Sequence, residues 1–238
     1  MPIKAIVFDM DDTLYYESDY VRSGMNELGK WVNENYNIDA FYKIAMNFFE
    51  KGERKYIINK TLDLLMIPYN EKLIQKMISI YRSHKPTIQL LNDSKWVLEN
   101  LEKNIKVGLI SDGYFIAQTN KVHSLGIKDK FQSIILTDQF GRNNWKPSHK
   151  PYEQMCLNLQ VCHDECVYVG DNVKKDFITA KKLGWKTVHI ERETGIYAKI
   201  TETPEYMAHY KINNLRELLD ILEFQHLFNT HCEEAFDS

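Results

Sequence analysis

The sequence predicts an α/β fold in which helices cover both faces of a parallel sheet and a further bundle of helices is inserted into the chain. Short apolar runs recur along the sequence, each bounded by turn residues and too short for a buried helix. From Asp93 onward, patterns of helical period separate these runs, and this alternation is typical of a parallel sheet. Between the first and second runs lies an almost entirely helical interval of about 90 residues, far longer than an ordinary connection.

Six of the short runs are interpreted as strands. Their residues are mostly apolar or β-branched, as in strands that are buried on both faces. We expect ligands beyond the carboxyl ends of these strands, where open α/β sheets bind them. The predicted strands are Lys4–Phe8, Lys106–Ile110, Ser133–Leu136, Cys166–Val169, Thr187–Ile190 and Tyr210–Ile212.

Apolar residues at helical spacing predict helices between the later strands. Gly184 is suited to the position just after the end of the third of these helices. The residues that indicate the helices are Trp96, Val97, Leu98 and Leu101, then Met155, Leu157 and Leu159, and then Phe177, Ala180 and Leu183.

The long interval after the first strand is interpreted as an inserted bundle of four short amphipathic helices. We place its borders near residues 16 and 85, so that residues 1–15 and 86–238 form the core and residues 16–85 the bundle. Its apolar positions are Met25, Leu28, Trp31 and Val32; Phe41, Ile44, Ala45, Phe48 and Phe49; Ile57, Ile58, Leu62, Leu65 and Met66; and Leu73, Ile74, Met77 and Ile80.

The composition is that of an ordinary folded protein. The chain has 238 residues, of which 44% are hydrophobic and 26% charged, which excludes disorder, collagen and low complexity. Thirty basic and 33 acidic residues leave a formal charge of −3, and no long block of Lys or Arg marks a nucleic-acid surface. No segment approaches the roughly 18 apolar residues of a membrane span. Neither nucleic acid nor membrane is expected as a partner.

Cysteine usage favours a reduced, cytoplasmic protein. Cys156, Cys162, Cys166 and Cys232 lie in a chain too long to need a disulfide framework. The N-terminus leads directly into the first strand, without the apolar region and cleavage site of a signal peptide. The pattern Cys162-His163-x-x-Cys166 lacks a second ligand pair for zinc, so Cys166 is expected to be a core residue.

Three carboxylates follow the first strand within four residues. Asp9, Asp11 and Asp12 precede Thr13 at the point where a parallel sheet places its ligand site. If the extended geometry persists, Asp9 and Asp11 project to the same side, and like charges at contact distance require a bound cation or a shared proton. Capping of the following helix needs only one such side chain, so a binding role for the others is the favoured interpretation.

Polar residues also end the second strand and follow the third. Ser111, Asp112 and Gly113 supply a hydroxyl and a permissive backbone for an oxyanion, although a turn of this composition needs no ligand. Lys146 is a candidate counter-charge for a phosphoryl group. Lys150 is also followed by proline and stays open as the alternative.

A second pair of acids follows the fourth strand. Gly170 and Asp171 end this strand, and Asp176 follows five residues after Asp171. Carboxylate oxygens at two strand ends suit Mg²⁺, which takes one or two protein carboxylates and completes its shell with water and phosphate. The alternative is that Asp171 caps a helix and Asp176 interacts with its dipole.

Taken together, these residues resemble the four motifs of the haloacid dehalogenase-like (HAD) hydrolase superfamily. The resemblance covers nearly the whole chain, and its first and fourth motifs are specific as a pair. It implies a Rossmann-like core in which residues 16–85 are a type 1 helical cap and residues 210–219 the last strand and helix. The matching residues are Asp9-Met10-Asp11-Asp12-Thr13, Ser111, Lys146-Pro147, and Gly170-Asp171 through Asp176.

The resemblance also implies a role for each residue. Asp9 would be the nucleophile that forms an aspartyl-phosphate, and Asp11 would be the general acid and base, for which a raised pKa is expected. Tyr152 lies at the family's aromatic spacing from Lys146, which favours Lys146 over Lys150. The implied residues are Asp9, Asp11, Lys146 and Ser111 for catalysis, Thr13, Asp112 and Gly113 for substrate binding, and Asp9, Asp11 (through its backbone carbonyl), Asp171 and Asp176 for Mg²⁺.

The expected function is therefore a Mg²⁺-dependent phosphatase that hydrolyses a small phosphorylated metabolite in the cytoplasm. An acid two residues after the nucleophile favours phosphate over a haloacid, since halide leaves without a proton. A phosphomutase of the same superfamily shares both acids and stays open. A non-hydrolytic phospho-switch is the alternative from another class, although a switch needs no inserted cap.

Overall fold

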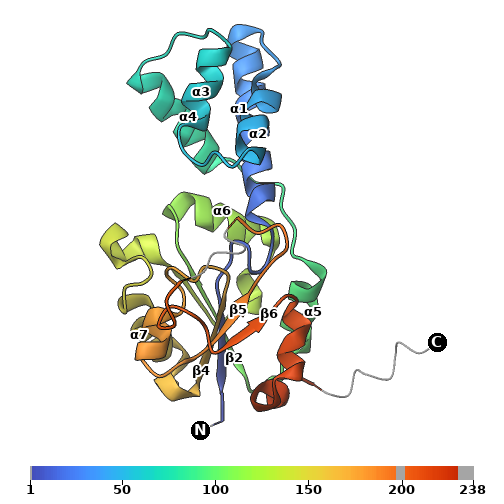
Figure 1. The fold of residues 1–238 in the computed structure, drawn as a ribbon, viewed down its shortest axis with the longest axis vertical. Helices are drawn as coiled ribbons and strands as arrows, with labels where there is room; N and C mark the ends of the chain where they lie inside the picture. Colours follow the sequence, from blue (N-terminus) through green and yellow to red (C-terminus); the bar gives the residue numbers. More distant parts are fainter. Residues whose placement is uncertain (1, 197–201, 230–238) are drawn as a thin grey trace, which may run out of the picture.

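The computed structural model describes residues 2–196 and 202–229, which include six parallel strands in one sheet (Figure 1). The strand order is β3-β2-β1-β4-β5-β6. The order reverses between β1 and β4, and the carboxyl ends of strands at such a point form the usual ligand site of open α/β sheets. The strands are β1 (Ala5–Phe8), β2 (Lys106–Ser111), β3 (Ser133–Leu136), β4 (Cys166–Gly170), β5 (Lys186–Ile190) and β6 (Tyr210–Ile212).

The predicted parallel α/β core is confirmed, and each predicted strand end lies within one residue of the observed one. One of these differences concerns the site. Ser111 belongs to β2 itself, because pairing with β3 continues as far as Ser111 opposite Leu136. The hydroxyl of Ser111 is therefore placed by the sheet and not by the turn that follows.

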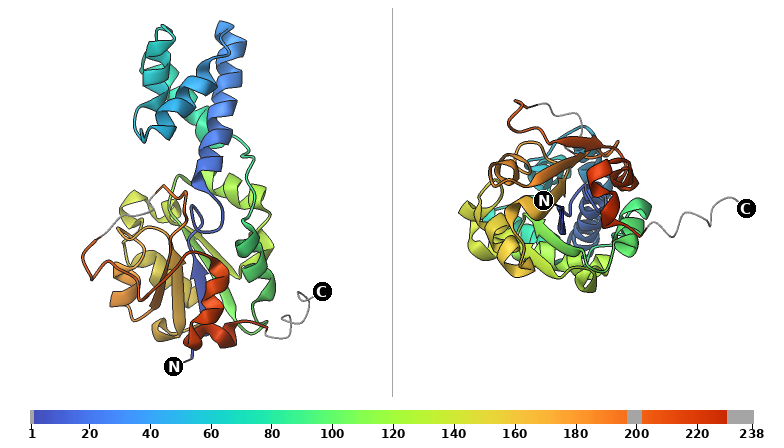
Figure 2. Two further views of the ribbon diagram at one scale, coloured as in Figure 1. Left: turned by 45° about the vertical axis from the view of Figure 1, so that its right-hand side comes forward. Right: turned by 90° about the horizontal axis from the view of Figure 1, so that it is seen from below.

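Helices cover both faces of the sheet (Figure 2). One face packs against α5 (Asn92–Asn100), α6 (Phe115–Leu125) and the 3-10 turns η5 (Leu215–Asp220) and η6 (Leu222–Leu227). The other face packs against α7 (Lys150–Leu159) and α8 (Ile178–Lys182). Shorter 3-10 turns are η1 (Lys128–Lys130), η2 (Thr137–Phe140), η3 (Arg142–Asn144) and η4 (His163–Glu165).

Three details of the predicted helices are wrong. Met66, expected among the apolar positions of the inserted bundle, lies beyond the end of α3 (Ile57–Leu64) and is 89% exposed. The segment after β6 forms 3-10 turns rather than an α-helix. Leu157 is 72% exposed, because α7 turns Met155, Cys156 and Leu159 toward the sheet and leaves Leu157 on its outer side. Gly184 follows α8 with a φ of +92°, as its predicted place just beyond the helix requires.

Four helices lie beyond the carboxyl ends of the strands (Figure 1). They are α1 (Glu17–Tyr36), α2 (Phe41–Glu50), α3 (Ile57–Leu64) and α4 (Glu71–Ser83), which we call the four-helix segment. Most of their buried apolar side chains form a cluster of their own, while Tyr20 belongs to one core of the sheet and Tyr81 packs against both. The two segments that connect these helices to the sheet lie side by side, since Leu91 N donates to the carbonyl of Leu14 at 3.0 Å.

No helix among the described residues is both long and apolar enough to cross a membrane. Cys156 and Cys166 are buried and Cys162 is exposed, and none of the three is in a disulfide. Cys232 lies outside the described residues.

Candidate active site

Three carboxylates converge where the strand order reverses. Asp9 directly follows β1, and Asp171 directly follows the neighbouring strand β4. Asp176 folds back toward them, so that one carboxylate oxygen from each residue lies within 4.8 Å of the others. All three side chains are buried. The structure therefore brings together three of the four residues that the sequence indicates for a metal.

The position of Asp176 depends on a glycine. A Cβ at Gly170 would lie 2.6 Å from Oδ2 of Asp176, so any larger residue would push the carboxylate away. The same oxygen accepts a hydrogen bond from Asn172 N at 2.9 Å, and the Tyr152 hydroxyl donates to the Asp176 carbonyl at 2.9 Å. The loop after β4 thus fixes the carboxylate against the end of that strand.

Lys146 neutralises part of this negative charge. Its Nζ lies 2.8 Å from Oδ1 of Asp9 and 2.8 Å from Oδ1 of Asp176, and it donates to the Tyr168 hydroxyl at 2.8 Å. Burial by itself lowers the pKa of Lys146, but the two carboxylates raise it well above its usual value. The ammonium group therefore stays charged: it donates hydrogen bonds to Asp9 and to the Tyr168 hydroxyl and forms an ion pair with Asp176.

The negative charge of Asp171 is not balanced by a lysine in this way. Among residues 2–196 and 202–229, no Lys or Arg forms an ion pair with its carboxylate. Burial, with the charges of Asp176 and Asp9, raises the pKa of Asp171 well above its usual value. A buried carboxylate of this kind needs a proton or a cation. Since Mg²⁺ prefers carboxylate oxygens, the three acids fit a divalent cation.

Asp11 faces other groups. Its Oδ1 accepts hydrogen bonds from Lys121 Nζ at 2.7 Å and from the Tyr15 hydroxyl, and its Oδ2 accepts one from Gln118 Nε2 at 2.9 Å. Burial acts to raise the pKa of Asp11, but Lys121 and the bonds from Tyr15 and Gln118 outweigh it, so the pKa is lowered. The expected raised pKa is therefore wrong for the protein without substrate, because sequence analysis does not reveal Lys121.

The expected pairing of Asp9 with Asp11 is also corrected. Strand β1 ends at Phe8, before either acid. The two carboxylates pair with different lysines, Asp9 with Lys146 and Asp11 with Lys121. The group that could hold a metal unites Asp9 with the acids after β4 and does not include the Asp11 carboxylate.

Gln118 connects Asp11 to Ser111. Its Nε2 donates to Ser111 Oγ at 2.6 Å as well as to Asp11. Gly113 has a φ of +137°, and a Cβ there would lie 2.8 Å from Cδ of Gln118. Glycine at this position therefore leaves room for the amide to reach both partners. Since Ser111 Oγ accepts this bond, its own O–H remains a donor for an oxyanion.

Asp112 and Thr13 are held inside the protein. Oδ1 of Asp112 accepts from Thr137 Oγ1 at 2.8 Å and from Lys146 N at 3.1 Å, and Oδ2 lies 3.0 Å from Lys175 Nζ. These bonds fix the backbone that carries Lys146. Thr13 is fully buried, and among the described residues its Oγ1 has no hydrogen-bond partner. Contact of either residue with substrate stays a prediction.

Sequence analysis does not reveal four polar side chains of the site, Tyr15, Gln118, Lys121 and Tyr168. Gln118 and Lys121 lie one turn apart on α6 and are 1% and 4% exposed. Both are polar residues among the apolar positions of a helix that follows a Ser-Asp-Gly turn, and this was the available signal. Tyr168 is a polar-tipped residue in an otherwise apolar buried strand.

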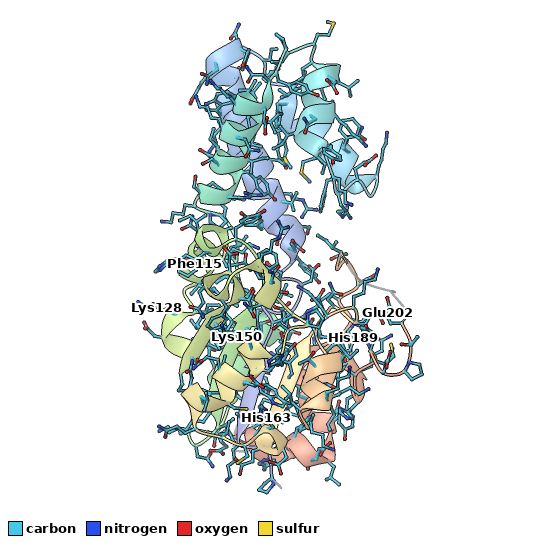
Figure 3. The ribbon with its side chains drawn as sticks, turned by 90° about the vertical axis from the view of Figure 1, so that its left-hand side faces the viewer. Phe115, Lys128, Lys150, His163, His189 and Glu202 are labelled. Carbon is cyan, nitrogen blue, oxygen red and sulfur yellow. The ribbon has the colours of Figure 1, made fainter. Side chains whose placement is uncertain are left out.

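The alternative phosphate-binding lysine, Lys150, and the possible zinc ligand His163 both lie apart from the site. Lys150 is exposed at the start of α7, with its Nζ 5.0 Å from the centroid of the Phe140 ring. His163 lies at the end of the sheet away from the four-helix segment (Figure 3). Cys166 is fully buried, as expected for a core residue. Within the described part of the chain, the group of Asp9 with the acids after β4 is the one that could hold a metal.

We expect Asp9 to make the stability of the metal-free protein depend on pH. Burial raises the pKa of Asp9 from 3.8 to about 6, although Lys146 acts in the opposite direction. The pKa of Asp9 is therefore higher in the folded state than in the unfolded state. As pH rises from roughly 4 to 6, ionisation of Asp9 lowers the free energy of unfolding by about 3 kcal/mol. As pH falls again, protonation of Asp9 restores this stability.

The Asp9→Asn variant isolates this effect, because asparagine does not titrate. In EDTA, the free energy of unfolding of the variant should increase by about 2–3 kcal/mol relative to that of the wild type as pH rises from about 4 to 7. Urea unfolding at each pH measures this difference. Mg²⁺ should reduce the pH dependence of the wild type, since a cation favours the ionised carboxylate. A difference between variant and wild type that is the same at both pH values would contradict the raised pKa.

Comparison with known proteins assigns the chain to a family. The model of the family described as haloacid dehalogenase-like hydrolase matches residues 6–190. The glyceraldehyde 3-phosphate phosphatase of Methanocaldococcus jannaschii is 35% identical over 232 residues, which cover 93% of this chain and 97% of that protein. The phosphatase of the same name from Pyrococcus furiosus is 28% identical, with 93% of each chain covered. A HAD-hydrolase of Bacillus subtilis, solved with bound magnesium, has the same fold, with a TM-score of 0.64 at 20% identity over 93% of this chain and 99% of that one.

Proposed function

The chain belongs to the haloacid dehalogenase-like hydrolase family and is a phosphatase, and from this premise we propose that it hydrolyses the phosphate ester of a small metabolite through Mg²⁺ and an aspartyl-phosphate. The observation that carries the proposal is the buried group of Asp9, Asp171 and Asp176, with Lys146 2.8 Å from two of them. These groups combine a nucleophile, a place for a dication and a fixed counter-charge for a phosphoryl group.

Asp9 is the nucleophile in this proposal. Lys146 favours its ionised form, which opposes the effect of burial. A carboxylate oxygen of Asp9 attacks phosphorus in line, the bond from phosphorus to the leaving oxygen breaks, and water later hydrolyses the aspartyl-phosphate to release inorganic phosphate. Asp9, Asp171 and Asp176 would hold the divalent cation, which supplies charge neutralisation and Lewis-acid polarisation when bound.

Asp11 is the proton donor and acceptor in this proposal. The approach of a phosphate dianion raises the pKa of Asp11, since a like charge disfavours its ionised form. Asp11 then carries a proton that it gives to the leaving alkoxide, and its ionised form accepts a proton from the attacking water. Lys121 and Gln118 hold the carboxylate in place in both states.

The four-helix segment, within the predicted borders at residues 16 and 85, is proposed to be the cap that covers the substrate. A 980 Å³ cavity lies among its helices and reaches the core at Ile196. Glu17, at the start of α1, and Ile196, on the core, line the cavity together with residues of all four helices. Closure of the cavity over the leaving group would exclude bulk water from the reacting atoms.

Arg82 is expected to bind the leaving group. It lines the cavity, and its guanidinium carbon lies 3.4 Å from the centroid of the Tyr114 ring, a stack that leaves the N–H edge available. Among the described residues, no carboxylate forms an ion pair with it. Arg82→Gln should raise KM by about tenfold, with kcat changed less than about threefold, because binding energy common to ground and transition states is lost.

A matched control for Arg82 is Arg22→Gln, which removes an arginine that already pairs with Asp19 on the outer side of α1. This variant should keep the wild-type KM and kcat in the same steady-state assay. A fall in kcat at constant KM in the Arg82 variant would contradict a role in leaving-group binding.

The test of the proposed function is phosphate release from a panel of phosphorylated metabolites, with Mg²⁺ and with EDTA. Glyceraldehyde 3-phosphate comes first because it is named in the relatives, followed by other sugar phosphates, nucleoside monophosphates and phosphoglycolate. Release that requires Mg²⁺ supports the hydrolase. Rearranged phosphorylated products without free phosphate would identify a mutase, and a stable phosphoprotein without turnover would identify a phospho-switch.

A further inference from the structure

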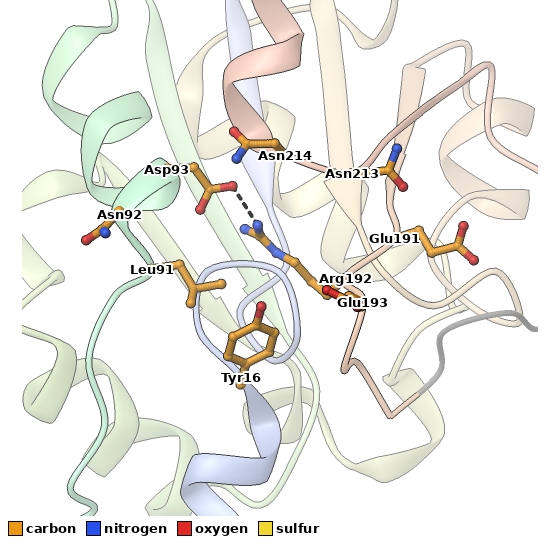
Figure 4. Close-up of a pocket in the computed structure, with 9 residues that line it drawn as sticks. All are labelled: Tyr16, Leu91, Asn92, Asp93, Glu191, Arg192, Glu193, Asn213 and Asn214. Carbon is orange, nitrogen blue, oxygen red and sulfur yellow. Dashed lines mark hydrogen bonds and ion pairs between the residues drawn. The ribbon is translucent and has the colours of Figure 1, made fainter.

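A buried ion pair lies behind the catalytic loop, which we define as residues 9–13. Arg192 follows β5, and its NH1 lies 2.6 Å from Oδ2 of Asp93 in the first turn of α5. Both side chains are 6% exposed. Figure 4 shows the pair beside Tyr16 and Leu91, where it lines a pocket of 580 Å³ together with other residues of the β5 and β6 ends.

The second terminal nitrogen of the Arg192 guanidinium contacts the catalytic loop. Its NH2 donates to the backbone carbonyl of Thr13 at 2.7 Å and to Ser94 Oγ at 3.3 Å. Asp93 is itself fixed, because its Oδ2 also accepts from Leu215 N at 2.8 Å. The rigid, planar guanidinium therefore sets the spacing between α5 and the end of the catalytic loop, which the point charge of a lysine does not do.

The segment that carries Arg192 also holds the preceding residue of the loop. Asp12 has a φ of +49°, which is uncommon for a residue with a side chain. Its Oδ2 accepts from Ile196 N at 2.6 Å, and its Oδ1 accepts from Glu17 N at 2.8 Å. Residues 192–196 thus bind two consecutive residues of the loop, and Asp12 also binds the first residue of α1.

We propose that Arg192 is a positioning residue for phosphoryl transfer, which acts through the Thr13 carbonyl to set the place of Asp11 relative to Asp9. This inference rests on the proposed function. Arg192 does not touch the reacting groups, since its described partners are Asp93, Ser94 and Thr13. Asp11 lies two residues before Thr13, and its carboxylate and backbone carbonyl both have stated places in the reaction. A displacement of such groups by about 1 Å costs roughly 100-fold in rate.

The variant Arg192→Lys separates positioning from stability. Lysine retains an ion pair with Asp93 and loses the hydrogen bond to the Thr13 carbonyl. We expect kcat to fall by about 10- to 100-fold while KM for the best substrate of the panel stays within about threefold. The Tm should stay close to that of the wild type, and a higher Mg²⁺ concentration should be needed to reach half of the Mg²⁺-induced rise in Tm.

Two further variants support this test. Arg216→Lys is the matched control, because Arg216 lies on η5 over the Trp96 ring and should leave kcat, Tm and the Mg²⁺ response unchanged. Asp12→Gly keeps the positive φ at no steric cost and removes the bonds to Ile196 and Glu17. It should lower kcat and raise the Mg²⁺ concentration needed for half of the rise in Tm. This variant replaces Arg192→Lys in the test if the Arg192→Lys protein does not fold.

Each outcome decides the inference. Folded Arg192→Lys and Asp12→Gly proteins with the kcat and Mg²⁺ response of the wild type would overturn it. Rates that return to the wild-type value when corrected for the folded fraction would also overturn it, since that result indicates a structural role alone. If the wild type releases no phosphate from any probe, the proposed function fails. The Mg²⁺ response of the Tm still reports separately whether Arg192 positions the loop.

Discussion

Replacing Asp9 with asparagine should abolish turnover and leave the fold in place. The amide is nearly the same size as the carboxylate and still accepts a hydrogen bond from Lys146, which lies 2.8 Å from Asp9. It has no anionic oxygen to attack phosphorus, so no aspartyl-phosphate forms. Loss of a covalent nucleophile lowers kcat by at least about 10⁴-fold. The measurement is steady-state phosphate release on the best substrate of the panel, with near-UV circular dichroism to verify the fold.

Trapping of the intermediate separates this mechanism from direct attack by water. An acyl phosphate reacts with hydroxylamine, so wild-type protein quenched during turnover should yield a hydroxamate at Asp9, and the Asp9→Asn protein should yield none. The Asp11→Asn protein is the informative control, because it keeps the nucleophile and loses the proton donor. An Asp9→Asn protein with a rate within about tenfold of the wild type would refute covalent catalysis by Asp9.

The backbone positions of the site follow from the sequence because the sheet determines them. Asp9 and Asp171 each come directly after a short apolar run, and parallel strands place such residues at one edge of the sheet. Gly113, with a φ of +137°, lies two residues after the end of β2, and a glycine there permits this conformation. Residues at strand ends can therefore be predicted from the periodicity of the chain.

The side chains that tune the site do not follow in this way. Lys121 lies 110 residues from its partner Asp11, and Arg192 lies 179 residues from Thr13. A lysine on a helix is usually exposed, and only the packing of α6 against the sheet turns this one inward. The pKa of Asp11 depends on that packing, so its direction could not be predicted from the local acid cluster.

Replacing Lys146 with methionine should cost both stability and activity. Methionine is similar in length and removes the ammonium group that lies 2.8 Å from both Asp9 and Asp176. Breaking a buried pair leaves uncompensated charge, which costs about 3–5 kcal/mol in the free energy of unfolding. The loss of a fixed cation at the phosphoryl group should lower kcat by at least about 10³-fold.

Lys150→Met is the matched control, because Lys150 is exposed and is also followed by proline. It should change stability by no more than about 0.5 kcal/mol and leave kcat unchanged. The stability deficit of Lys146→Met in EDTA should shrink as pH falls toward about 6, since Lys146 lowers the pKa of Asp9 and the variant therefore protonates Asp9 at a higher pH than the wild type. Wild-type activity in Lys146→Met together with loss of activity in Lys150→Met would transfer the phosphate-binding role to Lys150. A deficit that does not vary with pH would mean that Lys146 stabilises the fold through its other partners, Asp176 and Tyr168, and not through the charge of Asp9.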